Sequence, residues 1–370
     1  MDKEVKIVIG ANYGDEGKGL VSYCLAKEAK KAGRKVLNVF YNGGNQRAHT
    51  SNGIVRHCIG AGASTGADTY YNKWFVVDPI ALWLEDAKVF IHHDCRMVLP
   101  CDVVNNRKKE LARGTEKHGS CGMGIFEACK RDADPTYSFR INDLQKMSKA
   151  DLYNKLIRIE KEYGFPNDLV YNNETFIHAC EWVRQECRIV NDSMIFSWYD
   201  TFIFEGGQGL LLDQIHYNKG ENTHLTPSSP GVRNCIEDIH YNIGIAPDLY
   251  YVSRGYLTRH GAGEMESECE MDEINPDIVD NTNQPNPWQD SLRFGYLNQE
   301  KLHQRVFSDA IELQQATPIG AASVNLVYTQ LNYTHGKIAS GKGKTDDILL
   351  PEFADHVYVS DQKDEMELLQ

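Results

Sequence analysis

Several features that mark other protein classes are missing from this 370-residue sequence. It contains no run of about 18 apolar residues, which a membrane-spanning helix needs. Its first residues lead directly into a strand pattern, without the regions of a signal peptide. No two of its ten cysteines form a Cys-x-x-Cys pair, which disfavours a zinc site and indicates reduced thiols. We therefore expect a cytoplasmic protein (in the host cytoplasm if viral) with no membrane partner.

An excess of positive charge is also missing. The chain has 39 Lys and Arg against 52 Asp and Glu, a net charge of −13. A long nucleic acid as partner is therefore not expected, because neutralising its phosphates requires clustered cations. A mononucleotide needs only a few local cations and stays possible. Length alone allows one or two domains, and we predict a single domain over residues 1–370 with inserted helical and loop segments.

The N-terminal region has a recognisable order of elements. Val5–Ala11 is an apolar run typical of a buried strand, Gly19–Ala32 has helical spacing, and Lys35–Tyr41 is a second strand pattern. Strand, glycine loop, helix and strand form a βαβ unit, which predicts a parallel sheet. Further predicted strands are Lys88–His92, Thr201–Glu205, Leu249–Ser253 and Val324–Gln330; further predicted helices are Lys149–Tyr163 and Gln299–Gln315. The predicted fold class is α/β, a large, mostly parallel sheet with helices on both faces.

Two segments lack periodicity. Ile274–Trp288 is rich in Asn, Pro and Asp, which predicts a surface loop. The last ten residues, Asp361–Gln370, are expected to fray.

The loop from Gly10 to Gly19 (GANYGDEGKG) joins the first predicted strand to the first helix. Glycines there allow backbone N–H groups to face an anion at the helix N-terminus, and Lys18 adds a positive charge. The loop departs from the usual phosphate-loop pattern at Asn12 and at Gly19, where a Ser or Thr would bind a metal. It carries instead a carboxylate, Asp15, which phosphate would repel unless the carboxylate binds a metal or handles a proton. A tight turn with solvated charges is the simpler alternative.

Two more loops contain glycine and polar residues. Asn42–Thr50 (NGGNQRAHT) follows the second strand, and loops at one edge of a parallel sheet can face each other, so His49 is expected near Asp15. A single loop histidine is more often inert. His118–Gly124 (HGSCGMG) opens a helix and is weak evidence alone.

Seven blocks, in order, resemble adenylosuccinate synthetases. Tyr13–Gly19 is similar to their W-G-D-E-G-K-G, and Gly43–Thr50 to G-G-H-N-A-G-H-T. The other blocks are Gly119–Gly124 (G-T-T-G-R-G), Phe204–Asp213 (F-E-G-A-Q-G-T-L-L-D), Thr258–Gly263 (T-R-V-G-A-G), Arg293–Asn298 (R-T-G-W-L-D) and Tyr328–Asn332 (L-T-K-L-D). They span residues 5 to about 350, and the chain is short, like the archaeal and bacteriophage branches.

The resemblance implies a reaction. Asp15 would remove the N1 proton of a purine, and the 6-oxyanion would attack the γ-phosphate of a purine triphosphate. His49 and Mg²⁺ would stabilise the developing charge. L-Aspartate would then displace phosphate from C6. The family chemistry also implies a homodimer.

The resemblance also implies binding residues. The triphosphate set is Gly14, Glu16, Gly17, Lys18, Gly19, Thr50, Gln330 and Asn332. The monophosphate set is Asp15, Gln46, Ser120, Cys121, Gln208 and Thr226, completed by an arginine near Arg131 from the other subunit; an ordinary surface arginine is the alternative there. The aspartate set is Thr258, Arg259, Ser291 and Arg293, and Mg²⁺ would be bound by Asp15 and the carbonyl of Ala48.

Departures from the family pattern bear on substrates. Asn332 replaces an aspartate that accepts two guanine N–H groups, which predicts ATP or dATP as the donor; a simple turn residue is the alternative. Ser291 replaces an arginine that reaches the ribose region, which fits a deoxyribose, and Arg293 remains. Arg47 also alters the second loop. These changes resemble the phage branch that acts on dGMP, although Asp15 is retained where some phage members have serine.

Alternatives stay open. An adenylosuccinate synthetase acting on IMP is the nearest. A phosphate-loop kinase or NTPase would turn over nucleotide without aspartate, and the missing Ser or Thr after Lys18 argues against it. A catalytically silent nucleotide-binding protein is the third, and the presence of both Asp15 and His49 disfavours it.

Overall fold

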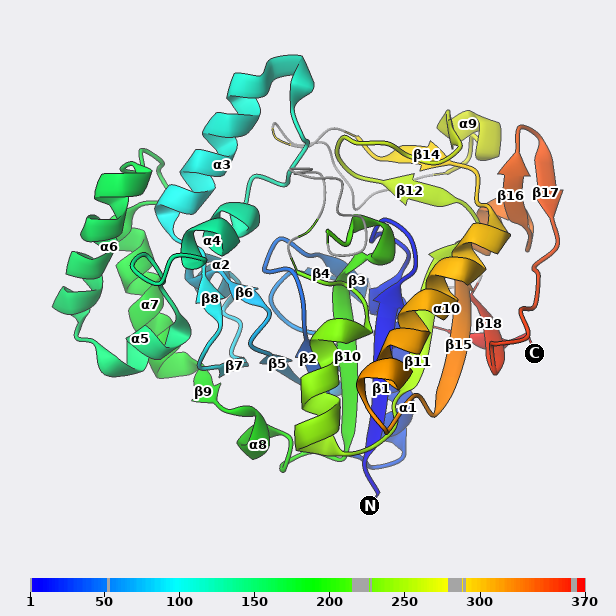
Figure 1. Cartoon of the computed structure of the whole chain (residues 1–370), viewed down its shortest axis with the longest axis horizontal. Helices are drawn as coiled ribbons and strands as arrows, with labels where there is room; N and C mark the ends of the chain where they lie inside the picture. Colours follow the sequence, from blue (N-terminus) through cyan, green and yellow to red (C-terminus); the bar gives the residue numbers. More distant parts are fainter. Residues whose placement is uncertain are drawn as a thin grey trace.

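A ten-stranded sheet forms the centre of the protein (Figure 1). The computed structural model describes residues 2–51, 54–214, 226, 228–278, 288, 291–360 and 365–369. All neighbouring strands are parallel except the last pair, β18 and β19. In spatial order they are β19 Glu367–Leu368, β18 His356–Ser360, β15 Ser323–Thr329, β11 Asp248–Arg254, β1 Glu4–Gly10, β10 Thr201–Gly209, β2 Val36–Phe40, β5 Asp68–Tyr71, β7 Phe90–His92 and β9 Arg188–Val190. The predicted fold class is confirmed.

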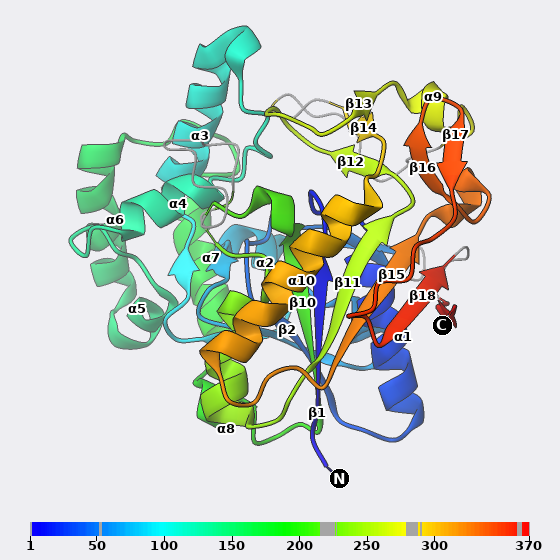
Figure 2. The same cartoon turned by 45° about the vertical axis from the view of Figure 1, so that its right-hand side comes forward.

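Helices cover both faces of this sheet. The longer ones are α1 Lys18–Lys31, α2 Pro79–Glu85, α3 Pro100–Arg113, α4 Ile125–Asp132, α5 Ile141–Lys146, α6 Lys149–Tyr163, α7 Asn173–Glu186 and α10 Gln299–Ala316. Strand β1 shows the two-sided burial, because side chains alternate along a strand. Ile7 belongs to the core cluster of Leu302 in α10, whereas Val8 belongs to the cluster of Leu25 in α1. Figure 2 shows these two helices on opposite faces.

A helical region lies beside the β5, β7 and β9 end of the sheet (Figure 1, left). Helices α2 to α7 share a hydrophobic cluster there with β7. Helix α6 has the predicted bounds because Ser148 caps its first turn by accepting the N–H of Asp151, and Gly164 follows its last residue.

Smaller strands lie above the carboxyl edge of the sheet. β12 (Leu257–Arg259), β14 (Arg293–Gly295) and β13 (Glu268–Cys269) form a three-stranded antiparallel sheet, which Figure 2 shows above β11 and β15. The other short elements are β3 His49–Ser51, β4 Ile54–Arg56, β6 Val76–Val77, β8 Arg96–Met97, α8 Asp192–Ile195, α9 Met271–Ile274, β16 Ile338–Gly341 and β17 Lys344–Asp346.

The C-terminal prediction was wrong in part. Glu367–Leu368 is not frayed but pairs antiparallel with β18, because the edge of a sheet offers unpaired backbone groups to an extended segment. Residues 361–364 and 370 lie outside the described residues, as do 279–287 of the predicted surface loop; Ile274 ends α9. Among the helices that the structure describes, none is long and apolar enough to cross a bilayer. The single-domain organisation stays a prediction.

Candidate active site

The loop after β1 is folded around its own carboxylate. Oε1 of Glu16 accepts the N–H groups of Asn12 (3.1 Å) and Gly14 (2.7 Å). Nζ of Lys18 lies 3.3 Å from Oε2 of Glu16 and donates to the carbonyl of Gly14 at 2.6 Å. The Glu16 side chain is only 3% exposed. Its carboxylate therefore shapes the loop from inside, and the proposed role of Glu16 in binding the triphosphate stays a prediction.

The end of this loop forms the start of α1. Gly17, at φ 96°, is the N-cap, and no side chain caps the first turn, which leaves that turn suited to an anion. A Cβ on Gly19 would lie 2.6 Å from Cβ of His49. Glycine at 19 therefore allows the first and second loops to touch, where a phosphate-loop Ser or Thr would not fit.

Asp15 is held by an arginine from the neighbouring strand. Nη2 of Arg254 donates to Oδ2 of Asp15 at 2.9 Å, and Nε of Arg254 donates to the Asp15 carbonyl at 2.6 Å. Arg254 is the last residue of β11, next to β1 in the sheet. The Asp15 side chain is about one third exposed (31%). A carboxylate in this setting stays accessible to a ligand and can accept a proton.

His49 lies in a buried, charged environment instead. Its Nδ1 is 3.5 Å from Oε1 of Glu205 in β10, and neither ring nitrogen has a hydrogen-bond partner among the described residues. The same Glu205 oxygen pairs with Nη2 of Arg47. Burial, more than any neighbouring charge, lowers the pKa of the His49 imidazole. His49 is therefore neutral at pH 7 and carries one N–H donor.

Arg47 completes this buried group. It donates to the carbonyl of Glu205 at 2.9 Å and stacks on the ring of Phe40 at 3.6 Å. The other carboxylate oxygen of Glu205 accepts the N–H of Ala61 at 3.1 Å. Burial also lowers the pKa of Arg47. The arginine that distinguishes the second loop thus serves to hold Glu205.

The predicted monophosphate residues form two groups. Near Gly43, a Cβ would lie 3.1 Å from Nε2 of Gln46 and 3.7 Å from Oε1 of Gln208, so the two amides lie close together. Ser120 and Cys121 lie in the third loop, where Asn106 donates to Oγ of Ser120 at 2.9 Å. Burial raises the pKa of the Cys121 thiol, so it stays protonated.

The third loop packs on the loop that follows β12. The N–H of Ala262 donates to the carbonyl of His118 at 3.0 Å, and a Cβ on Gly119 would lie 2.6 Å from Cα of Gly261. The third loop, predicted to bind the monophosphate, thus contacts the loop that follows the predicted aspartate-binding residues Thr258 and Arg259. Thr226 is buried, and its Oγ1 accepts the N–H of Ser228 at 3.3 Å.

The prediction for Arg131 was wrong, and so was the surface alternative. Its side chain is fully buried. Nε and Nη2 donate to Asp102 at 2.9 to 3.2 Å, and the remaining bonds reach the carbonyls of Met97 and Tyr137, both at 2.7 Å. An arginine bonded on all sides inside the helical region cannot reach a phosphate of another subunit.

The two predicted aspartate-binding arginines lie side by side but differ. Arg259 and Arg293 are register partners across β12 and β14. Nε of Arg293 donates to Glu268 at 2.7 Å, Nη2 to the other Glu268 oxygen, and Nη1 to two loop carbonyls at 2.9 Å. Arg259 stacks over Tyr13 at 4.8 Å and donates from Nη1 to the carbonyl of Glu264 at 2.5 Å, while its buried Nε has no partner among the described residues. Arg259 is the better placed to receive a carboxylate; Arg293 would first have to release Glu268.

The remaining predicted site residues differ in exposure. Thr258 is buried in β12 and Ser291 is exposed. Asn332 is exposed in the 3₁₀ turn Leu331–Thr334, which follows Gln330 at φ 58°. Thr329, just before them, donates its hydroxyl to the carbonyl of Glu16 at 2.6 Å, so this turn adjoins the first loop. The side chain of Thr50 lies outside what the structure describes.

The donor set at the first two loops fits a magnesium ion. Mg²⁺ prefers carboxylate and carbonyl oxygens, and the Asp15 carboxylate and the exposed Ala48 offer such oxygens.

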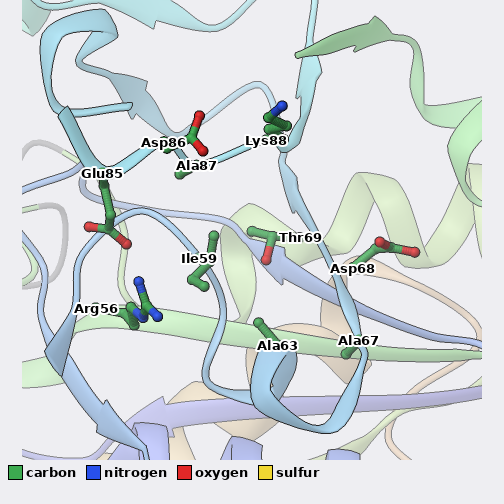
Figure 3. Close-up of a pocket in the computed structure, with 10 residues that line it drawn as sticks. All are labelled: Arg56, Ile59, Ala63, Ala67, Asp68, Thr69, Glu85, Asp86, Ala87 and Lys88. Carbon is green, nitrogen blue, oxygen red and sulfur yellow. The ribbon is translucent and has the colours of Figure 1, made fainter. Parts of the chain in front are cut away.

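A pocket of about 270 Å³ lies elsewhere (Figure 3). It is lined by Arg56, Ile59, Ala63, Ala67, Asp68, Thr69, Glu85, Asp86, Ala87 and Lys88. It lies near the amino ends of β5 and β7 and contains none of the predicted site residues.

The sequence reasoning missed two residues, Arg254 and Glu205. Each ends or nearly ends an apolar run of a predicted strand, YYVSR and TFIFE. A charged residue at the carboxyl end of a parallel strand lies where ligands bind in such sheets. That position was the signal that could have identified both.

A parallel sheet with glycine loops at its carboxyl edge defines an α/β protein with a phosphate-type loop. The family model described as adenylosuccinate synthetase matches residues 7–284. The chain therefore belongs to the adenylosuccinate synthetase family.

Three adenylosuccinate synthetases illustrate the relationship. That of Nitrosospira multiformis is 30% identical over 305 residues (74% of this chain, 66% of that protein), and that of Aliivibrio fischeri is 26% identical over 387 residues (93% and 82%). That of Mycobacterium leprae is 28% identical over 298 residues, 71% of this chain. The last match spans only 64% of the M. leprae protein, slightly under two thirds of its length.

Two solved structures share the fold. The fully ligated adenylosuccinate synthetase from Plasmodium falciparum has a TM-score of 0.66 at 18% identity, over 90% of this chain and 77% of that one. The succinoaminodeoxyadenylate synthetase of cyanophage S-2L, bound to dGMP and dATP as an energy donor, has a TM-score of 0.58 at 17% identity, over 90% and 86%.

Proposed function

We propose that the protein is a Mg²⁺-dependent C–N ligase that joins L-aspartate to C6 of a purine nucleoside monophosphate. The substrates we favour are dGMP, L-aspartate and ATP or dATP. The products are 2-amino-2′-deoxy-N6-succinyladenylate, the nucleoside diphosphate and phosphate. The single observation that carries the proposal is the accessible Asp15 carboxylate on a phosphate-type loop, held by Arg254 beside the His49 loop.

The reaction has two steps. Asp15 takes the N1 proton of the purine, and O6 attacks the γ-phosphorus as the diphosphate leaves. The amine of L-aspartate then bonds to C6, the C6–O bond breaks, and phosphate departs. A bound Mg²⁺, held by Asp15 and the Ala48 carbonyl, would neutralise charge on the phosphates.

The protein groups supply orientation and hydrogen bonds. The neutral imidazole of His49 donates its N–H to an oxygen of the transferring group. The first turn of α1 and Lys18 face the donor phosphates. Arg259 receives a carboxylate of aspartate, to which a guanidinium can donate twice, and Gln46 and Gln208 contact the monophosphate.

Two features support dGMP and an adenine donor. Ser291 gives the ribose region no long cation, and Asn332 can face an adenine edge because an amide both donates and accepts. The cyanophage protein of the same fold, bound to dGMP and dATP, carries such a pair of ligands. We further propose a homodimer in the cytoplasm, of a phage-infected host if the chain is viral.

A product assay tests the proposal. The protein is incubated with L-aspartate, Mg²⁺, ATP or GTP, and dGMP, GMP or IMP in parallel, and the succinyl products are measured by mass spectrometry. We expect the largest kcat/KM with dGMP and ATP. If product forms from IMP alone, the substrate is IMP and not dGMP. Phosphate release without aspartate would indicate an NTPase. Nucleotide binding without turnover would indicate a catalytically silent protein.

The donor preference has its own test. Asn332→Asp should shift the ratio of kcat/KM toward GTP by about tenfold or more, because a carboxylate accepts both guanine N–H groups. Asn332→Ser serves as the control, since it removes the amide without adding an acceptor pair. An unchanged ratio in Asn332→Asp would contradict this role of Asn332.

A further inference from the structure

We infer that Arg254 is a positioning residue for Asp15, fixing the place of its carboxylate through bonds to the side chain and the backbone of the same residue. This inference rests on the proposed function, because it concerns the group proposed as the base. None of the motif blocks described above includes Arg254.

Two hydrogen bonds from Arg254 define the orientation of Asp15. Nε of Arg254 donates to the carbonyl of Asp15 at 2.6 Å, and Nη2 donates to its carboxylate Oδ2 at 2.9 Å. One planar guanidinium therefore fixes both where Asp15 lies and which way its carboxylate points. A lysine could donate to both oxygens only with a poorer geometry, because its ammonium is a single point on a flexible stem.

The support of Arg254 is itself rigid. It ends β11, where it pairs in register with Thr329 of β15, and Nη1 lies 3.4 Å from the hydroxyl of Tyr256. Its side chain is 11% exposed, against 31% for Asp15. Thr329 also binds the carbonyl of Glu16 at 2.6 Å. Two neighbouring strands, β11 and β15, thus anchor the loop at Asp15 and at the next residue, Glu16.

This arrangement has a consequence for the reaction. A general base must lie within hydrogen-bond reach of the proton that it removes, and a misplacement of about 1 Å can reduce the rate roughly 100-fold. Without Arg254, Asp15 would stay chemically intact but lose its fixed position. The loss should therefore appear in kcat and not in the KM of the nucleotides.

The experiment compares Arg254→Ala and Arg254→Lys with the full-length wild-type protein, using the product assay with dGMP, ATP and L-aspartate. We expect kcat to fall about 100-fold in Arg254→Ala and about tenfold in Arg254→Lys, with KM values changed less than threefold. Guanidinium at millimolar concentration should restore part of the kcat of Arg254→Ala and leave the wild type unchanged.

Arg34→Ala is the matched control. Arg34, in the turn before β2, likewise binds the backbone and a side chain of a neighbouring segment: it donates to the carbonyl of Asp200 at 2.9 Å and to Oγ1 of Thr201 at 2.5 Å, but at the amino edge of the sheet. The kcat of Arg34→Ala should stay at the wild-type value.

If kcat falls as much in Arg34→Ala as in Arg254→Ala, or if both Arg254 variants keep the wild-type kcat, the inference is overturned while the proposed ligase function is unaffected. If the wild type forms no succinyl product, the proposed function fails and the inference falls with it. Should Arg254→Ala fail to fold, Arg254→Lys decides alone.

Discussion

The two side chains proposed to take part in the phosphoryl-transfer step occupy opposite environments. Asp15 is about one third exposed and bonded to Arg254, whereas His49 is buried and its ring nitrogens have no hydrogen-bond partner among the described residues. Both loops are glycine-rich and touch at Gly19. The difference arises from the strands beside them, since the Arg254 side chain that binds Asp15 comes from β11 and the Glu205 carboxylate beside His49 comes from β10, on opposite sides of β1. Neighbouring strands, and not the loop type, determine the charge environment.

The largest expected effect is on the exposed side of this comparison. Asp15→Asn keeps the size of the side chain and its contact with Arg254 but removes the base, so kcat should fall by about 10³-fold or more. The free energy of unfolding should change little, because the carboxylate is partly solvated. Product assays and urea unfolding of the same preparation measure both. Retained turnover would remove Asp15 from the proposed mechanism.

Changes to the buried group around His49 should lower the free energy of unfolding. Glu205→Gln leaves Arg47 charged and without its ion pair in the interior, which should cost about 3 kcal/mol of unfolding free energy. Glu266→Gln, which breaks the exposed pair with Lys301 at 3.1 Å, is the control and should cost far less. Urea titrations give both values. Equal losses of unfolding free energy in the two variants would show that burial does not make the Arg47–Glu205 pair more important for stability than the exposed pair.

The pH dependence of stability should also follow the buried side. Because the folded-state pKa of His49 is lowered, the unfolded chain binds a proton first as pH falls through about 6.5. Stability from this group is thus complete above that pH and declines below it, by at most about 1.4 kcal/mol per pH unit. The measurement compares unfolding at pH 7.5 and 5.5 in the wild type and in His49→Gln. The decline should be smaller in the variant; an identical decline would assign it to other groups.

The predictable part of the fold was local. The bounds of α6 follow from a cap at Ser148 and a glycine at 164, and β1, α1 and β2 follow from periodicity over short windows. Strand order was not predictable, because pairing joins distant segments: β10, about 160 residues along the chain, lies between β1 and β2. The pairing of β19 was missed for the same reason.

The site divides in the same way. Motif spacing identified the segments that carry Asp15, His49 and Arg259, but the role predicted for Arg131 was wrong because its side chain is fully buried. Motifs specify which residues occur along the chain, and burial depends on what packs against them. The ligand contacts of the site residues stay predictions.

The sequence by itself determined the α/β class, the glycine loops with their carboxylate and imidazole, and the family blocks, because each is written in residues close together in the chain. The tertiary structure alone decided that Arg254 holds Asp15, that Glu205 lies between Arg47 and His49, and that Arg293 is occupied by Glu268. The Arg254 and Glu205 contacts join residues more than 150 positions apart, and only the folding of the sheet brings such residues within hydrogen-bond distance.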